Sequence, residues 1–178
     1  MPQAVTHVII ALIIASLIRD YAVKDKKKFP LHYVLIAGLA GLLPDIDITV
    51  YWILHWFGFT IQQVHRTFSH NIFVPTFFLL LAGLSVRFKN KELGRHHLKL
   101  HLIFLMIASG VFIHLILDAS LAGQIMPFYP FSNFAIGHDI TRLMPAPLNS
   151  IFFPCLDAAL FVIWLIYMEW KHKISDFL

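Results

Sequence analysis

Charged residues are scarce in this sequence. Only 13% of the 178 residues are charged, whereas 58% are hydrophobic and the mean hydropathy is +0.73. This composition excludes a water-soluble globular domain and is typical of a protein embedded in a membrane. At roughly 20 residues for each span, the length allows one integral-membrane domain, 1–178, of about four to six spans.

Cysteine is almost absent, because Cys155 is the only one. A single cysteine excludes an intramolecular disulfide, a CxxC pair and a zinc site built from thiolates. A metal site would therefore need histidine and carboxylate ligands. Internal repeats are also lacking, so nothing supports the inverted repeats of many transporters.

Five apolar stretches predict an all-α, polytopic membrane helix bundle of about five spans. The second stretch is interrupted by Gly38 and Gly41 and, at Pro44–Asp47, by a proline followed by two aspartates, so we expect its helix to be broken there. The loop 119–149, rich in proline and aromatic residues, predicts an irregular cap, partly inserted in the membrane. The five apolar stretches are 4–18, 33–57, 71–86, 100–117 and 150–170.

The basic residues indicate an orientation. Five lie in 19–32, five in 87–99 and two in the C-terminal tail, which leaves only Arg66 and Arg142. With five spans these three segments share one side, so the positive-inside rule predicts the N-terminus outside and the C-terminus in the cytoplasm. Short loops beside membrane helices carry such charge for orientation and for anionic lipids, so we expect no nucleic-acid partner.

Asp45 and Asp47 of the segment GLLPDID place two carboxylates within the second span. Inserting one aspartate at the centre of a membrane helix costs about 2.5–3.5 kcal/mol, so both carboxylates need partners that offset this free energy. Capping of the helix that resumes after Pro44 would explain one of them and leave the other unexplained.

His114 and Asp118 of HLILD stand four residues apart at the outer end of the fourth span, so both side chains lie on one helical face. Together they could bind one metal ion. They could equally join two helices through hydrogen bonds.

The segment HRTFSH, 65–70, lies in a short outer loop. On a regular helix His65 and His70 would diverge by about 140°, so they converge only if the loop turns, and they could serve different ions. His7 lies in the outer half of the first span. A lone histidine on an apolar helix is more often a hydrogen-bonded core residue.

The combination predicts a metal centre, because residues from four separate segments all fall at or above the outer half of the membrane. Nitrogen and oxygen ligands of this kind suit zinc or another divalent ion, and more than one ion would balance three carboxylates. The candidate ligands are His7, Asp45, Asp47, His65, His70, His114 and Asp118.

Three further polar residues have open roles. His138 and Asp139 of the outer loop could reach the site, and Asp157 in the fifth span could support a liganding histidine. His55 is unassigned. The histidines expected at the cytoplasmic side, away from the site, are His32, His96, His97, His101 and His172.

Five motifs follow one another along the chain: Thr6–His7, GLLPDID, HRTFSH, HLILD and YPFS (129–132). In this order they resemble the YdjM-type inner-membrane family of metal-dependent hydrolases, also described as LexA-binding. The resemblance covers residues 6 to 132. That family is in turn similar to the zinc-dependent phospholipases C and single-strand nucleases, helical enzymes with His and Asp ligands around clustered zinc ions.

The resemblance implies a location in a prokaryotic cytoplasmic membrane. It also implies metal ligands at His7, an Asp of PDID, a His of HRTFSH, His114 and Asp118. Asp118 would bridge two ions. The soluble enzymes add a further His and Glu. No His-x-x-x-Glu occurs here, so the resemblance does not extend to the complete cluster.

The leading hypothesis is a metal-dependent phosphoesterase, similar to phospholipase C, that acts on a lipid or lipid-linked phosphate at the outer membrane face. Water is the expected nucleophile, Asp45 or Asp47 the base, and Arg66 and Ser69 the candidate substrate-binding residues. Arg66 could instead be the counter-ion of Asp45 or Asp47. Phe and Tyr residues of 119–149 would contact acyl chains.

Three alternatives stay open. A serine hydrolase would use Ser69, but the only neighbouring base is His70 and the chain lacks a Gly-rich elbow. A divalent-metal or proton transporter would need polar residues through both leaflets. A regulatory, LexA-linked role would use the cytoplasmic surface, which has no recognisable DNA-binding motif.

The orientation can be tested with reporter fusions. A reporter active only outside should work near Gly123, and one active only inside should work near Lys91 and after Leu178, because of the distribution of Lys and Arg. The opposite pattern would move the histidines and aspartates to the cytoplasmic side.

Overall fold

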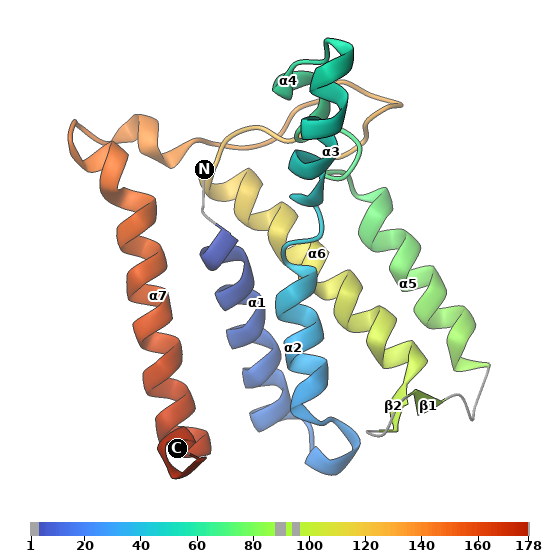
Figure 1. Cartoon of the computed structure of the whole chain (residues 1–178). Coiled ribbons are helices and arrows are strands. Elements are labelled where there is room, and N and C mark those ends of the chain that lie inside the picture. The colour runs from blue at the N-terminus through green and yellow to red at the C-terminus, as the bar shows by residue number, and fades with distance from the viewer. Residues whose placement is uncertain (1–3, 88–91, 94–96, 178) are drawn as a thin grey trace.

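A computed structural model describes residues 4–87, 92–93 and 97–177 of the chain (Figure 1). The protein is a helical membrane bundle, with one short hairpin of strands β1 (Glu92–Leu93) and β2 (Leu98–Lys99). The α-helices are α1 (Ala4–Leu17), α2 (Leu31–Ala40), α3 (Ile46–Leu54), α4 (Ile61–Val64), α5 (Phe73–Val86), α6 (Leu100–Leu121) and α7 (Leu148–His172). Shorter helical turns are η1 (Ile18–Ala22), η2 (Lys26–Lys28), η3 (His55–Phe57), η4 (Ile140–Leu143) and η5 (Ile174–Phe177).

Three of the five expected spans form helices long and apolar enough to cross a membrane: Ala4–Ala22, Leu100–Leu121 and Leu148–His172. The other two stretches also form apolar helices, but α2 has 10 residues and α5 has 14, short of the roughly 20 that a full crossing needs. Both pack against the long α6.

The predicted break in the second span is confirmed. Helix α2 ends at Ala40, a turn follows, and α3 begins at Ile46. Asp45 occupies the N-cap position of α3, but its side chain makes no capping hydrogen bond, so capping does not account for this carboxylate. Gly41 lies against α1, where an added Cβ would stand 2.7 Å from the carbonyl oxygen of His7.

Helix α6 lies at the centre, in contact with α1, α2 and α5, while α7 packs against α1 (Figure 1). Gly110 allows α6 to approach α2 closely, because a Cβ there would overlap the Ala37 carbonyl oxygen and lie 2.8 Å from the Cβ of Ala40. The main buried apolar cluster consists of Ile9, Leu12, Ala15, Phe29, Tyr33, Val34, Ala37 and Met106.

The loop between α6 and α7 forms the expected irregular cap over the end of the bundle where α1 begins and α6 ends (Figure 1). Isolated bridges pair Ala122 with Asp139 and Ile125 with Ile136, so the cap folds back on itself. Several of its apolar side chains are exposed, Phe131 by 83% and Leu143 by 84%, as expected for a surface that meets lipid.

At the opposite end, a buried aspartate that the sequence did not single out joins α7 to the end of α1. Asp20 accepts hydrogen bonds from Arg19 at 2.8 Å and from Tyr167 at 2.7 Å, and His172 Nε2 lies 3.0 Å from its carboxylate. These groups satisfy a carboxylate that would be costly to bury alone.

The basic segments 19–28 and 171–173 lie at this same end, away from the cap (Figure 1). His32, His101 and His172 lie there too, as expected. Lys89, Lys91, Arg95 and His96 fall outside the described residues.

The close contact at Gly110 predicts that Gly110→Ala lowers the free energy of unfolding by about 1–3 kcal/mol, because the backbones of α2 and α6 must separate. Gly83→Ala is the matched control, because a Cβ at Gly83 meets nothing within 4 Å and alanine favours helix. Thermal unfolding in one detergent measures both variants. Equal unfolding temperatures would contradict the tight α2–α6 contact.

Candidate metal centre

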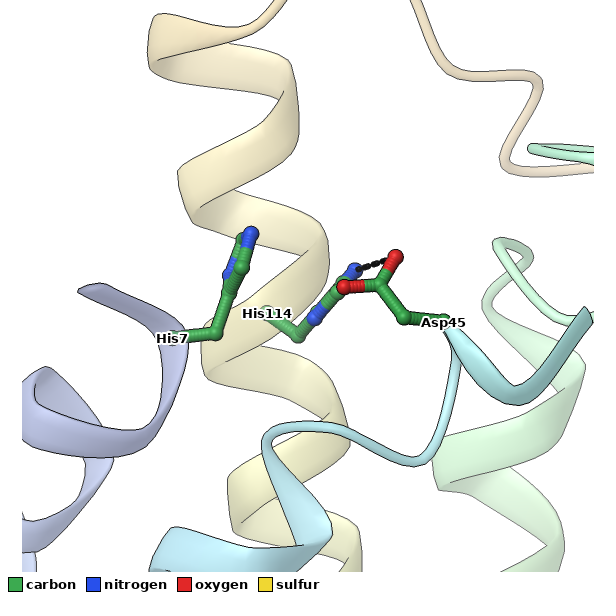
Figure 2. Close-up of side chains that lie close together, drawn as sticks. All are labelled: His7, Asp45 and His114. Atoms are coloured by element: carbon green, nitrogen blue, oxygen red, sulfur yellow. Dashed lines mark ion pairs between the residues drawn. The ribbon is translucent and has the colours of Figure 1, made fainter. Parts of the chain in front are cut away.

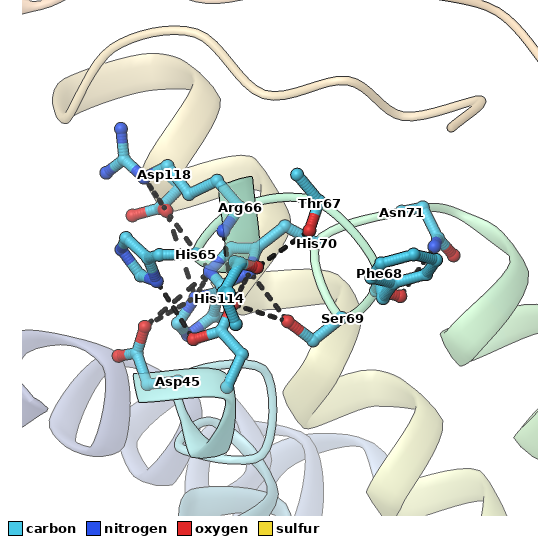
Figure 3. A network of polar contacts seen from close by, with 12 residues as sticks. Asp45, His65, Arg66, Thr67, Phe68, Ser69, His70, Asn71, His114 and Asp118 are labelled. Carbon is cyan, nitrogen blue, oxygen red and sulfur yellow. Dashed lines mark hydrogen bonds and ion pairs between the residues drawn. The ribbon is translucent and has the colours of Figure 1, made fainter. Parts of the chain in front are cut away.

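Four segments far apart in the sequence bring histidines and aspartates together beneath the cap. Helix α1 contributes His7 (Figure 2). The turn before α3 contributes Asp45, the loop between α4 and α5 contributes His65 and His70, and α6 contributes His114 and Asp118 (Figure 3). We call these six residues the His/Asp cluster. Most are buried, and Asp45 is the most exposed of the carboxylates, at 24% of its side chain.

Within the His/Asp cluster, three sets of residues each offer ligand atoms within 4.8 Å of one another. The sets overlap, because Asp45, His70 and His114 each belong to two of them. Figure 2 shows the first set, with three side chains from three different segments pointing toward one another. The sets are His7–Asp45–His114, Asp45–His65–His70 and His70–His114–Asp118.

The centre of the cluster is the pair of Nε2 atoms of His70 and His114, which are 3.1 Å apart. Two nitrogens on one tetrahedral zinc ion, at about 2.0–2.1 Å from the metal, stand about 3.3 Å apart. Asp45 Oδ1 lies 3.5 Å from His70 Nε2 and 3.7 Å from His114 Nε2. On another side, Asp118 Oδ2 lies 3.6 Å and 3.9 Å from the same two nitrogens.

Backbone contact fixes the orientation of His114. Its Nδ1 donates to the carbonyl oxygen of Gly41 at 2.7 Å, which leaves Nε2 without a proton in the neutral ring. The broken span therefore supplies the acceptor that turns Nε2 toward the cluster. This is the arrangement in which a histidine binds a metal ion through one nitrogen and is held through the other.

His7 has an unsatisfied polar atom. The ring is 1% exposed and stacks on His114 with centroids 3.9 Å apart, and its Nε2 lies 3.5 Å from Asp118 Oδ1. Its Nδ1 is buried and has no hydrogen-bond partner among the described residues. A buried nitrogen left unpaired is costly, and a bound cation would satisfy it.

Asp47 lies behind the histidines and belongs to none of the three ligand sets, although the sequence predicted it as a ligand. Its Oδ1 lies 2.9 Å from His65 Nδ1. Its Oδ2 accepts from the Arg66 amide at 3.1 Å and from the Ser69 hydroxyl at 2.7 Å, and lies 3.2 Å from His70 Nδ1. These contacts occupy both oxygens, so Asp47 orients two imidazoles and is poorly placed to act as a base.

The HRTFSH loop turns, as convergence of its histidines required. Arg66 has a φ of 64°, in the left-handed region, and the rings of His65 and His70 come within 5.0 Å of each other. The Arg66 side chain pairs with Asp118, Nε to Oδ2 at 3.1 Å, and donates to the Ala122 carbonyl oxygen at 3.1 Å. It is thus a counter-ion of Asp118, whereas the sequence suggested Asp45 or Asp47.

The pKa of His70 is raised above its ordinary value. Burial alone would lower it, but hydrogen bonds to Asp45 and Asp47 and the charge of Asp118 favour the protonated ring. A proton on His70 and the charge of Arg66 therefore offset part of the negative charge when no cation is bound. Metal binding would displace that proton.

The residues with open roles lie around the cluster. His138 and Asp139 are in the cap, and Asp157 accepts a hydrogen bond from the hydroxyl of Thr6, the neighbour of His7. One oxygen of Asp157 is buried and has no hydrogen-bond partner in the described part of the chain. His55 lies 3.3 Å from the Tyr51 hydroxyl.

Three cavities surround the cluster, and one differs in character. Apolar side chains dominate a cavity of about 390 Å³ that Asp47 and Ser69 border, and another of about 620 Å³ between α1 and α7. The third, of about 550 Å³, lies under the cap and has polar walls that include Arg66 and Arg142. We call it the polar cavity.

The position of Asp47 predicts that Asp47→Asn weakens metal binding by about 10–100-fold without abolishing it, because the imidazoles lose their support but the ligand atoms remain. Equilibrium metal titration measures the change. Asp25→Asn, at an exposed aspartate of the opposite end, should leave affinity unchanged. Complete loss of metal in Asp47→Asn would place Asp47 among the ligands.

Comparison with known families gives one match. The family model described as YdjM inner membrane protein matches residues 1–174, nearly the whole chain. Comparisons with curated proteins and with solved structures each gave no match. The match agrees with the apolar helices and with a location in the inner membrane. This chain, with its buried histidines and aspartates, belongs to the YdjM inner membrane protein family.

Proposed function

We propose that the chain is a metal-dependent phosphoesterase that hydrolyses a lipid-borne phosphate. The observation that carries this proposal is the convergence of the Nε2 atoms of His70 and His114 with Asp45 and Asp118, at separations of 3.1–3.9 Å. A structural hydrogen-bond network would pair its buried groups, whereas this cluster leaves His7 Nδ1 unpaired.

The donor set fits divalent zinc, which takes imidazole nitrogens and carboxylate oxygens. His70, His114, Asp45 and Asp118 would hold one ion, and His7 with the other oxygen of Asp118 would contribute to a second. More than one ion is proposed because Asp45, Asp47 and Asp118 bring three carboxylates to one buried site. Such ions lower the pKa of bound water and neutralise phosphoryl oxygens.

The chain's own residues have distinct roles in this proposal. Asp45 is the candidate base through the oxygen other than Oδ1, which faces His70 and His114, because its carboxylate is partly exposed and both oxygens of Asp47 are occupied. Arg66 would bind a phosphate oxygen with the N–H groups that Asp118 and Ala122 leave unused. In the hydrolysis, water gives its oxygen to phosphorus, the phosphorus bond to the leaving oxygen breaks, and that oxygen receives a proton.

The surroundings suit a lipid substrate. Phe128, Phe131 and Phe134 of the cap are exposed, and the apolar cavities beside the cluster offer space for a hydrocarbon chain. With the basic segments facing the cytoplasm, the cluster would face the outer leaflet.

A serine hydrolase is less well supported. The Ser69 hydroxyl lies 3.0 Å from His70 Nδ1, but it donates to Asp47 at 2.7 Å, so its proton is directed to a carboxylate and not to an imidazole base. A nucleophilic serine needs a base that removes its proton and is itself held by a third group. We expect Ser69 to position Asp47 or to line the neighbouring cavity.

A transporter is also less well supported. Between the His/Asp cluster and Asp20, the buried core consists mainly of apolar side chains such as Ile9, Leu12 and Met106. An ion path would need polar groups along that distance. A regulatory, LexA-linked role remains an alternative that a lack of hydrolysis would favour.

Hydrolysis can be tested on the purified full chain. Metal analysis should find more than one divalent ion per chain. A screen of phospholipids and prenyl phosphates should show phosphate-ester hydrolysis that a chelator removes and zinc restores. Metal content above one equivalent without hydrolysis of any lipid phosphate would contradict the enzymatic proposal and leave the metal site standing.

The variant Asp118→Asn tests whether Asp118 is a metal ligand or only joins two helices through hydrogen bonds. If Asp118 only hydrogen-bonds its neighbours, asparagine should cost about 1 kcal/mol of stability and leave metal content unchanged. As a ligand, its loss should release metal and reduce hydrolysis by more than the roughly 10–100-fold expected for a supporting residue.

His114→Ala should behave like Asp118→Asn, whereas His101→Ala, at the opposite end of α6, should alter neither metal content nor activity. An Asp118→Asn protein that folds with its full complement of metal would overturn the assignment of the site.

A further inference from the structure

We infer that the polar cavity binds a second anionic group of the substrate, beyond the phosphate at the His/Asp cluster. A lipid diphosphate is the simplest molecule with this chemistry. The inference rests on the proposed function and narrows its substrate class to lipid phosphates that carry a further negative group.

The walls of the polar cavity distinguish it from its neighbours. Its volume of about 550 Å³ is within the usual range for small-ligand sites. Its polar side chains are those of Arg66, Gln124, His138, Asp139 and Arg142. An apolar chain fits the other two cavities better, so a substrate with a charged head and an apolar tail has a separate place for each part.

Arg66 connects the polar cavity to the His/Asp cluster. Its guanidinium contacts Asp118 through Nε and the Ala122 carbonyl oxygen through one terminal nitrogen, and Ala122 itself lines the cavity. An arginine has five N–H donors, so this side chain can meet groups on both sides. Two phosphates joined by one oxygen could therefore contact the same guanidinium from the cluster and from the cavity.

The charges of the walls favour an anion. Arg66 and Arg142 are cationic, whereas Asp139 is the single acidic lining residue. The Asp139 carboxylate accepts from the Thr141 amide and hydroxyl, and Arg142 Nε lies 3.3 Å from it. Arg142 is 85% exposed, so its other donors face the solvent of the cavity mouth. A cationic head group would meet two guanidinium groups and a carboxylate that is already paired.

Backbone contacts hold this cavity in place. The His138 amide donates to the Ala119 carbonyl oxygen at 2.8 Å, and the Gly123 amide donates to the His138 carbonyl oxygen at 3.2 Å. At Gly137, with a φ of 136°, a Cβ would overlap the Gly123 carbonyl oxygen and lie 2.8 Å from that of Ala119. The cap is thus joined to the end of α6, and the cavity is formed before a ligand arrives.

The test compares ligands that differ by one phosphate. Equilibrium binding of radiolabelled farnesyl diphosphate and farnesyl monophosphate is measured on the metal-loaded full chain in nanodiscs. We expect the diphosphate to bind more tightly. Arg142→Gln should weaken its binding about tenfold, leave the monophosphate unchanged and retain all metal, because one charge-assisted contact is lost.

Two controls make the comparison specific. Arg87→Gln, at the end of α5 away from the cap, should change neither affinity. A diacylglycerol diphosphate, compared with phosphatidic acid, shows whether a diacyl or a prenyl chain carries the second phosphate. Phosphatidylcholine should gain nothing from the cavity, because its head group ends in a cation.

Equal affinities for the diphosphate and the monophosphate would overturn the inference, and so would a diphosphate affinity that Arg142→Gln leaves unchanged. Both outcomes are independent of turnover. If the chain hydrolyses lipid phosphates but shows no preference for the diphosphate, only the second anionic site is refuted. If it prefers the diphosphate, loses that preference in Arg142→Gln and hydrolyses nothing, the second site is supported and the phosphoesterase is refuted.

Discussion

Burial of negative charge is the constraint on which this structure depends. Asp45, Asp47 and Asp118 lie together at one end of an apolar bundle, where an unpaired carboxylate would be strongly destabilising. Histidines of α1, the HRTFSH loop and α6, together with Arg66, supply the opposing groups. Formation of this cluster requires α1, the broken second span, the HRTFSH loop and α6 to meet at one place, so the polar centre determines how the helices are arranged.

Close helix contact makes that meeting possible. Gly110 lets the backbone of α6 approach α2, and Gly41 lets the end of α2 approach α1 at His7. Gly41 then accepts the hydrogen bond that orients His114. Small residues are common where membrane helices approach closely, and here Gly41 both permits packing and orients a candidate ligand. Packing and site geometry are therefore linked at the broken span.

The sequence predicted the helical membrane class, the break at Pro44 and the irregular cap, because hydropathy and proline act locally. It also named all six residues that the structure brings together, since buried charge is unusual enough to be informative. It did not show that Asp47, unlike Asp45, lies outside the ligand sets, because two aspartates two residues apart give no sign of which one faces a neighbouring loop. It also missed Asp20, whose partners Tyr167 and His172 are about 150 residues away, and the pairing of Arg66 with Asp118.

Helix α7 makes its contacts with the bundle mainly through α1, and polar groups hold it near both ends. The Thr6 hydroxyl donates to Asp157 toward the cap, and at the other end Tyr167 donates to Asp20, which His172 also contacts. Apolar packing alone tolerates sliding, because one lipid-facing side chain can replace another. A slip of α7 by one helical turn, about 5.4 Å, would break both polar contacts at once. The two contacts therefore fix the register of α7 against α1.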